Sequence, residues 1–192
     1  MLSVAKVASA GGAANYYAQE DNYYFLGEQS TKWFGEGAKR LGLEGTVEKD
    51  TFKQVLEGHL PDGSDLSHIR NGENVHRAGY DYTFSAPKSV SLLALIQGDK
   101  DVLNAHKSAV EKAMTEIESL ASTRSMETQE KGIVETKNLV SALFLHDTNR
   151  NLEPHLHTHA IVANATYDEN TEKFKTLSTD KTGNSKGFVE VT

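Results

Sequence analysis

Four histidines lie close together between residues 146 and 159. In the segment HDTNRNLEPHLHTHAIVANA, His146 comes first, and His155, His157 and His159 occupy alternate positions near its middle. Side chains alternate between the two faces of a β-strand, so these three imidazoles share one face as far as the strand extends. The DTNRNLEP segment then returns the chain beside the preceding strand, which places His146 next to His157 and His159.

Three neutral imidazoles that converge on one point form a site for a divalent metal ion, with further positions open to water or substrate. The alternative is a solvent-exposed polar strand whose histidines are only hydrated. A metal at such a site could activate water for hydrolysis, or it could polarise a phosphoryl or carbonyl oxygen as a Lewis acid. The histidines alone favour neither use.

Two tyrosine pairs occur near the N-terminus, in ANYYAQEDNYYFLG. Tyr16 and Tyr23 are seven residues apart, as are Tyr17 and Tyr24. In an unbroken helix, Tyr16 would therefore share one face with Tyr23, and Tyr17 would share one face with Tyr24. These tyrosines could be packing aromatics or a platform on which single-stranded DNA bases stack. Beside a Lewis-acid metal, however, a phenol can also act as a nucleophile.

A phenol with an ordinary pKa near 10 needs assistance to attack at neutral pH. A metal on a scissile phosphate would neutralise the charge that builds on its oxygens. A nearby carboxylate could accept the phenolic proton or orient a metal-bound histidine. Asp81, within GYDYTFS, is the candidate for that carboxylate.

The rest of the sequence indicates an α+β fold, a central antiparallel β-sheet flanked by helices. We predict a first strand in residues 1–9, followed by helices in 13–19 and 30–41, with Gly11 and Gly12 opening the first of them. The further elements predicted from periodicity and turn residues are helices in 48–57, 89–96 and 101–120 and strands in 79–85, 123–127, 132–136, 138–147, 157–166 and 173–177.

Composition narrows the class of protein further. With 192 residues, 38% of them hydrophobic, the chain can bury the core of one domain. It has no cysteine, so thiolate metal sites and disulfides are excluded. The net charge of −7 argues against bulk DNA binding but permits a local basic track. The longest apolar run, at 90–96, is too short to cross a membrane, and no secretory signal is evident, so we expect a cytoplasmic protein without membrane insertion.

These motifs resemble the relaxase domain of the conjugative TraI/TrwC (MobF) family, from F-like and related plasmids. The resemblance covers MLSVAKVASAGGAANYY, DNYY, GYDYTFSAPKSVS and HDTNRNLEPHLHTHAIVAN, in the family's order. It implies a circularly permuted HUH-endonuclease (Rep-like) fold in which the tyrosines precede the histidine motif. It also implies site- and strand-specific nicking and religation of DNA at an origin of transfer, through a covalent 5′-phosphotyrosine.

The resemblance assigns roles to individual residues. Tyr16 would be the principal nucleophile, and Tyr17, Tyr23 and Tyr24 would include an auxiliary tyrosine. Asp81 falls on the acidic position of the site, whereas His155 lies just outside the metal motif. The residues that would contact the metal ion are His146, His157 and His159, and those that would contact DNA are Lys88 and Arg150.

The family resemblance implies Mg²⁺ or Mn²⁺ as the cofactor, although imidazole donors also suit Zn²⁺ or Ni²⁺. The expected partners are single-stranded DNA at the origin of transfer and accessory proteins of the relaxosome, and we expect a monomer. Residues 1–192 would form one relaxase domain that is shorter at its C-terminal end than the family's. In the family, C-terminal helices close over single-stranded DNA.

Two other functions remain open from the sequence. A three-histidine hydrolase that acts through activated water would keep its activity in a Tyr16→Phe variant. A non-catalytic single-stranded DNA-binding module would bind DNA without nicking it. The relaxase interpretation predicts that Tyr16→Phe sharply reduces covalent capture of DNA.

Overall fold

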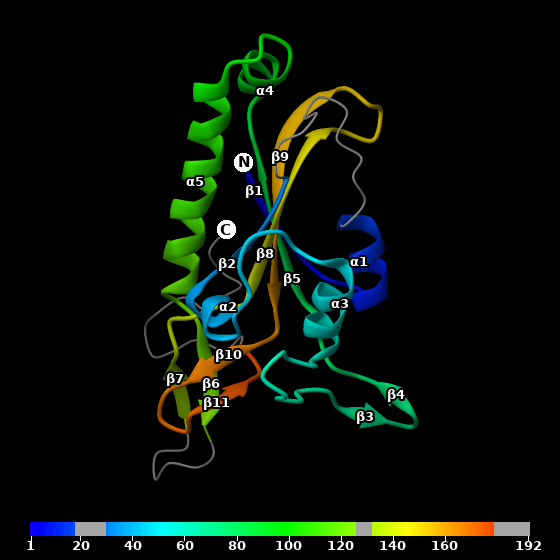
Figure 1. The fold of residues 1–192 in the computed structure, drawn as a ribbon, viewed down its shortest axis with the longest axis vertical. Coiled ribbons are helices and arrows are strands. Elements are labelled where there is room, and N and C mark those ends of the chain that lie inside the picture. The colour runs from blue at the N-terminus through cyan, green and yellow to red at the C-terminus, as the bar shows by residue number, and fades with distance from the viewer. Residues whose placement is uncertain (18–29, 126–131, 179–192) are drawn as a thin grey trace.

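A five-stranded antiparallel sheet forms the centre of the molecule (Figure 1). The computed structural model describes residues 1–17, 30–125 and 132–178. The strands of the sheet, in spatial order, are β1 (Leu2–Lys6), β5 (Gly79–Ser85), β9 (Pro154–Ala163), β8 (Ser141–Thr148) and β2 (Thr31–Phe34). Every neighbouring pair is antiparallel, which confirms the predicted α+β class.

One long helix, α5 (Lys100–Glu118), covers one face of the sheet (Figure 1). The Asp99 side chain caps its N-terminus by accepting two backbone N–H bonds, of 3.0 and 3.1 Å. Its inward side chains, Val110, Met114 and Ile117, are buried in one cluster with alternate residues of β5, β8 and β9. These side chains form an apolar layer between α5 and this face of the sheet.

Two helices, α1 (Ala10–Tyr17) and α3 (Lys49–Glu57), lie on the opposite face (Figure 1). Helix α3 ends at Gly58, whose left-handed φ of 92° favours glycine. The apolar side chains that α3 buries at helical spacing are Phe52, Val55 and Leu56. They pack on the same sheet face as Phe144.

Helix α1 begins earlier than its glycines predict. Ser9 caps it, because its Oγ accepts the Gly12 N–H at 3.1 Å and its carbonyl accepts the Ala13 N–H at 3.0 Å. Gly11 and Gly12 therefore lie inside the first turn instead of ending the strand. The preceding strand already ends at Lys6.

The helix predicted for residues 30–41 is wrong in its first half and correct in its second. The structure has the edge strand β2 there, followed by the short helix α2 (Glu36–Arg40). Gly35 separates them with φ 106°, and a Cβ at this position would lie 2.3 Å from the Leu139 carbonyl oxygen. The Trp33 N–H donates to the Gly45 carbonyl at 3.0 Å, so pairing on both edges of β2 decides its conformation.

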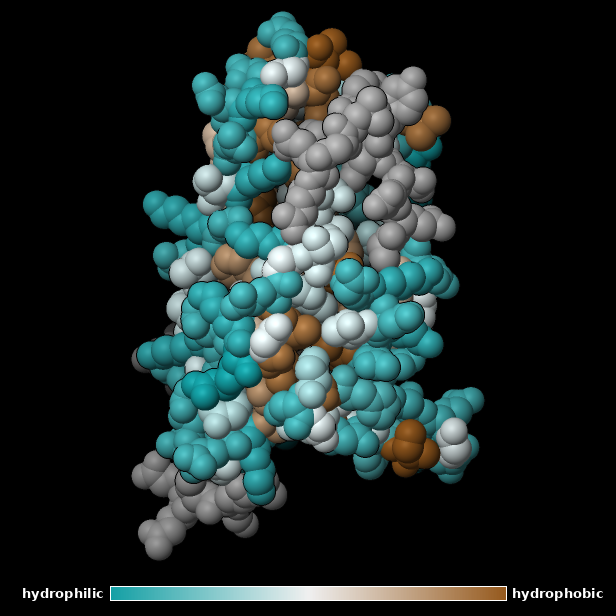
Figure 2. All heavy atoms as spheres, in the orientation of Figure 1, coloured by the Kyte–Doolittle hydropathy of each residue, from teal (hydrophilic) through white to brown (hydrophobic). Residues whose placement is uncertain are grey.

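The remaining helix, α4 (Lys88–Leu95), follows Pro87 and leaves apolar side chains at the surface. Hydrophobic atoms gather at this end of the molecule (Figure 2), where Leu92, Leu93 and Ile96 are 41%, 38% and 57% exposed. None of the helices among the described residues combines the length and the apolar character needed to cross a bilayer.

Three small hairpins lie outside the central sheet (Figure 1). Their strands are β3 (Ile69–Arg70) with β4 (Glu73–Asn74), β6 (Ser122–Ser125) with β7 (Gly132–Glu135), and β10 (Thr166–Asp168) with β11 (Lys173–Lys175). The strands predicted around residues 123, 132 and 173 therefore exist, but β6 pairs with β7 and β11 pairs with β10, so none of them joins the central sheet. The first hairpin was not predicted.

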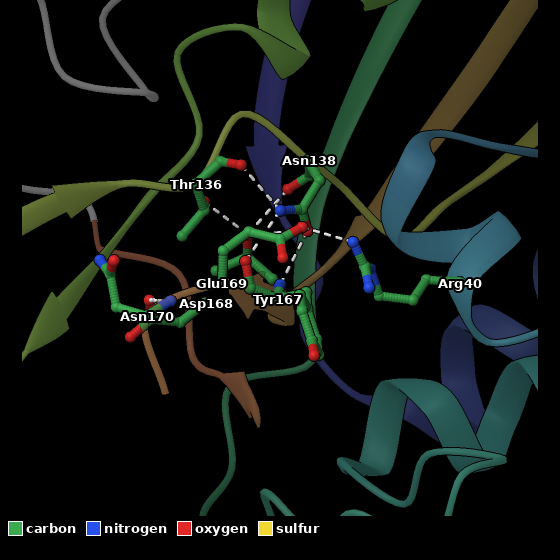
Figure 3. Close-up of polar contacts among 8 residues, drawn as sticks. Arg40, Thr136, Asn138, Tyr167, Asp168, Glu169 and Asn170 are labelled. Atoms are coloured by element: carbon green, nitrogen blue, oxygen red, sulfur yellow. Dashed lines mark hydrogen bonds and ion pairs between the residues drawn. The ribbon is translucent and has the colours of Figure 1, made fainter. Parts of the chain in front are cut away.

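The β10–β11 hairpin is held against the body of the fold by a polar network (Figure 3). The Asn138 amide nitrogen donates to the carbonyls of Thr136 and Tyr167, each at 2.8 Å, and its oxygen accepts the Tyr167 N–H at 2.7 Å. From α2, the Arg40 guanidinium lies 4.0 Å from the centre of the Tyr167 ring and pairs with Glu169. These contacts have a structural role at the end of the sheet away from the β8–β9 turn.

Candidate active site

Three histidines converge on the sheet face that α1 covers. The β8–β9 register places His146 directly opposite His157, and His159 follows two residues later on the same face. Ring centroids are separated by 5.3 Å for His146 and His157, 5.2 Å for His146 and His159, and 5.1 Å for His157 and His159. One ring nitrogen from each residue lies within 4.8 Å of the other two.

The surroundings of His146 and His157 keep these two imidazoles neutral. His157 and His159 are only 8% and 9% exposed. Burial is the main cause that lowers the pKa of His146 to about 3 and the pKa of His157 to about 4. An uncharged imidazole has a ring nitrogen with a free lone pair, so His146 and His157 can each bind a cation at neutral pH.

Hydrogen bonds orient two of the three rings. The His157 Nδ1 lies 2.9 Å from the His155 carbonyl oxygen. The His159 Nδ1 lies 2.8 and 3.0 Å from the two Asp81 carboxylate oxygens. Because a carbonyl and a carboxylate only accept, Nδ1 donates in both rings and Nε2 keeps its lone pair. A carboxylate behind an imidazole is the usual outer partner of a metal-binding histidine.

Tyr16 lies at the open side of the triad. Its side chain is 54% exposed, although α1 is anchored below it by the buried Ala13 and Ala14. The Tyr16 ring centroid is 6.4 Å from that of His146 and 6.2 Å from that of His159. The last turn of α1 therefore presents an accessible phenol beside the three histidines.

Tyr17, the next residue, points into the protein. Its ring packs against Phe144 and His159, with centroid distances of 5.7 and 4.9 Å, and its hydroxyl donates to the Asp81 Oδ2 at 2.7 Å. Burial, followed by the Asp81 charge and this hydrogen bond, raises the pKa of Tyr17 far above its ordinary value. The two adjacent tyrosines thus have different environments.

Two other predicted site residues, Lys88 and Arg150, are not gathered at the triad. Lys88 and Arg150 are exposed near the β8–β9 turn, where the Lys88 Nζ donates to the Pro154 carbonyl at 3.1 Å and lies 3.7 Å from a Glu153 carboxylate oxygen. Tyr23 and Tyr24 lie outside the described residues. The site that the structure assembles consists of Tyr16, Tyr17, Asp81, His146, His157 and His159.

Sequence reasoning missed two neighbours of this site. Thr83 faces His159 across the β5–β9 ladder, with its Oγ1 3.1 Å from the His159 Nδ1 and 3.3 Å from the Asp81 Oδ1. Its position two residues after Asp81 on one strand was the available signal. On the other sheet face, His106 of α5 lies 3.0 Å from the Thr158 Oγ1, a contact with no local sequence signal.

A sheet that presents a His-x-His pair and a third histidine beneath a tyrosine-bearing helix is an HUH-type fold. The model of the TrwC relaxase family matches residues 10–191. The chain therefore belongs to the TrwC relaxase family.

Two curated relatives are described as "Multifunctional conjugation protein TraI". The protein from Escherichia coli strain K12 is 55% identical over 190 residues, and a second from Escherichia coli is 54% identical over 190 residues. Both alignments cover 99% of this chain but 11% of the relative. The chain thus spans about a tenth of the length of the curated relatives that it matches.

Solved structures of TrwC share the fold. A metal-bound complex of TrwC with oriT DNA superposes with a TM-score of 0.81 and 37% identity over 93% of this chain and 61% of the other. A complex with a 27-mer that contains the recognition hairpin and the cleavage site has a TM-score of 0.79 and 35% identity, covering 93% and 60%. A copper-bound oriT complex gives 0.82 and 37%, covering 94% and 62%.

Proposed function

We propose that this chain nicks and reseals one DNA strand at a plasmid origin of transfer, with Tyr16 as the nucleophile. The observation that carries the proposal is the accessible Tyr16 phenol beside three converging histidines. Family membership supports it, as do the TrwC structures, which hold oriT DNA. The substrate is single-stranded DNA that carries the origin.

The donor set fits a divalent metal ion. His146, His157 and His159 each offer one ring nitrogen, and the Nδ1 hydrogen bonds of His157 and His159 leave Nε2 as the ligand atom. When bound, the ion supplies Lewis-acid stabilisation of charge on the phosphate oxygens. Imidazole donors suit Zn²⁺ or Ni²⁺ better than Mg²⁺, which prefers oxygen. A TrwC structure holds copper, and Mg²⁺ or Mn²⁺ as the working ion stays a prediction.

The proposed reaction exchanges one phosphodiester bond for another. The Tyr16 oxygen bonds to the scissile phosphorus and gives up its phenolic proton to solvent. The bond from phosphorus to the 3′ oxygen breaks, and that oxygen takes up a proton to become a free 3′ hydroxyl. The 5′ phosphate stays on Tyr16 as a diester, so attack by a 3′ hydroxyl reverses the step and reseals the strand.

Of the two roles considered for Asp81, the contacts support the orienting one. The carboxylate is 7% exposed and already engaged by the Tyr17 hydroxyl and the His159 Nδ1. Both contacts fix the His159 ring and the tautomer that exposes Nε2. Asp81 is therefore a positioning residue for the metal ligands.

The test is a denaturing gel with an oligonucleotide that contains the origin recognised by the related TraI proteins. In one arm the label is at the 3′ end, and in the other it is at the 5′ end. Transesterification moves the 3′ label into a protein-linked band and leaves the 5′ label on a shorter free strand. EDTA, Tyr16→Phe, and a double variant carrying His157→Ala and His159→Ala should each remove most of the protein-linked band.

The same gel separates the two rival functions. A hydrolase that uses activated water would leave both labels on free, shorter strands and would tolerate Tyr16→Phe. A non-catalytic DNA-binding module would retard the oligonucleotide on a native gel and leave it intact on the denaturing gel. Either pattern would contradict the proposal.

The remaining predictions concern the wider setting of the chain. The assignment of residues 1–192 to one relaxase domain, the relaxosome accessory proteins, the monomeric state and the cytoplasmic location stay predictions.

A further inference from the structure

The final turn of α1 places two adjacent phenols in opposite settings. Successive residues of an α-helix point about 100° apart, since 3.6 residues complete one turn. Tyr16 consequently faces solvent at the mouth of the triad, while the half-buried Tyr17 ring packs against Phe144 and His159. A difference this large between neighbours indicates that they do different things.

The Tyr17 hydroxyl is one of three donors around a buried carboxylate. It lies 2.7 Å from the Asp81 Oδ2, and the His159 Nδ1 lies 2.8 Å from the same oxygen. The Thr83 hydroxyl lies 3.3 Å from the Asp81 Oδ1. A carboxylate removed from water needs such partners, and its position is set by them.

The chain of contacts ends at the metal triad. Asp81 holds the Nδ1 edge of the His159 ring, so any rotation of the carboxylate would turn the opposite edge, which carries Nε2. Tyr17 restrains that rotation from the helix side, and its ring also packs directly on the His159 ring. The α1 helix is therefore connected to the metal ligands through Tyr17.

We propose that Tyr17 is a positioning residue, which fixes Asp81 and through it His159, and not a second nucleophile. The inference rests on the proposed nicking function only for the chemistry of Tyr16. The structural part of the inference does not depend on that function. It predicts that Tyr17, which is not a metal ligand, influences the affinity of the histidine triad for the metal ion. The adjacent tyrosines then divide the tasks of attack and of ligand orientation.

Mn²⁺ binding by the DNA-free protein tests this directly. Free Mn²⁺ gives a sharp electron paramagnetic resonance signal that is lost on binding, so a titration at fixed pH yields the affinity. Loss of an outer partner of a metal ligand costs about 10–100-fold in affinity, and we expect that range for Asp81→Ala. Tyr17→Phe acts one contact further out, and roughly a threefold to tenfold loss is expected.

Tyr16→Phe is the matched control, because it removes the same atom from the neighbouring residue and should leave Mn²⁺ affinity unchanged. In the Asp81→Ala background, Tyr17→Phe should add no further loss, since the group through which it acts is absent. Thermal unfolding of each variant checks that it folds. The comparison of Tyr17→Phe with Tyr16→Phe remains decisive should Asp81→Ala fail to fold.

Three results would overturn the inference. The first is equal Mn²⁺ affinity for Tyr17→Phe and Tyr16→Phe, and the second is a wild-type protein that takes up no Mn²⁺. The third is mass-spectrometric detection of DNA linked to Tyr17 in the Tyr16→Phe variant. Because the metal titration contains no DNA, a failure of nicking would refute the proposed function and leave this result standing.

Discussion

His146 and His157 are directly paired across the β8–β9 ladder, with ring centroids 5.3 Å apart. Side chains alternate along a strand, so a slip of one residue would move His146 to the opposite sheet face, under α5. The turn between Thr148 and Pro154 and the buried residues of both faces hold this register. The triad is thus a property of strand pairing.

Removal of His146 should therefore disable the metal centre. We expect His146→Ala to weaken Mn²⁺ binding by at least about 100-fold, because even outer partners of ligands contribute 10–100-fold. Covalent capture of the origin oligonucleotide should fall in parallel. His155→Ala is the control, since the His155 side chain stacks on His157 but lies outside the triad, and its affinity should stay within a few-fold of wild type. Similar losses in both variants would contradict the assignment.

The metal-free protein should lose stability as the pH falls below about 6.5. Burial holds the pKa of His146 near 3 and the pKa values of His157 and His106 near 4, whereas unfolded histidine has a pKa of about 6.5. Between these values the unfolded chain binds more protons than the folded one, so protons favour unfolding. The loss begins as pH drops through 6.5 and is complete only below about 3.

Thermal unfolding at pH 7.5, 6 and 5 in EDTA measures this effect, and Tm should fall at each step. His106→Asn removes one of the three groups, so its Tm should depend less steeply on pH. Mn²⁺ added in place of EDTA should raise Tm, because the ion binds the folded triad and not the unfolded chain. A Tm that is constant from pH 7.5 to 5 would contradict the buried, neutral state of these histidines.

Phe144 connects the tyrosine helix to the core. Its side chain is 1% exposed and packs on Tyr17 and on Phe52, with a centroid distance of 5.0 Å to the latter. Phe144→Ala should lower the free energy of unfolding by about 3–5 kcal/mol, through lost burial and the cavity left behind. Leu152→Ala, at a side chain that is 76% exposed, should change it by less than about 0.5 kcal/mol. Urea unfolding of both variants makes the comparison.

Lys88 and Arg150 should contribute to DNA affinity through phosphate contacts near the β8–β9 turn. Each phosphate contact on a single strand contributes a slope of about −0.7 to the dependence of log affinity on log salt. Lys88→Ala and Arg150→Ala should therefore each weaken binding a few-fold and reduce the slope by about that amount, as measured by fluorescence anisotropy. Lys137→Ala, an exposed lysine before the opposite end of β8, is the control. Unchanged salt slopes would remove both residues from the interface.

Local patterns predicted much of this fold correctly. The strand predicted in residues 79–85 is β5 within the same bounds, and the helix predicted in 101–120 corresponds to α5 (Lys100–Glu118). The alternation of His157 and His159 with apolar neighbours predicted a shared face. These successes depend on short-range periodicity, which a sequence states directly.

Residues 30–41 show where such patterns fail. Their composition favours a helix, yet β8 on one side and the Gly45 carbonyl on the other make residues 31–34 an edge strand. The β8 partner is far from this segment in sequence, and the Gly45 carbonyl lies beyond its C-terminal end. Pairing with distant segments outweighed local helix propensity, which contributes only fractions of a kcal/mol per residue.

The sequence by itself determined the chemistry available to this protein: three histidines that could share a metal ion, tyrosines that could attack a phosphate, and one carboxylate to assist them. Only the tertiary structure decided how that chemistry is divided. The direction of the last turn of α1 exposes Tyr16 and turns the half-buried Tyr17 toward the sheet, and the β5–β9 pairing brings Asp81 to His159. Two adjacent, identical side chains carry the same local signal, so their environments differ only because the packing of a helix on a distant sheet gives them different neighbours.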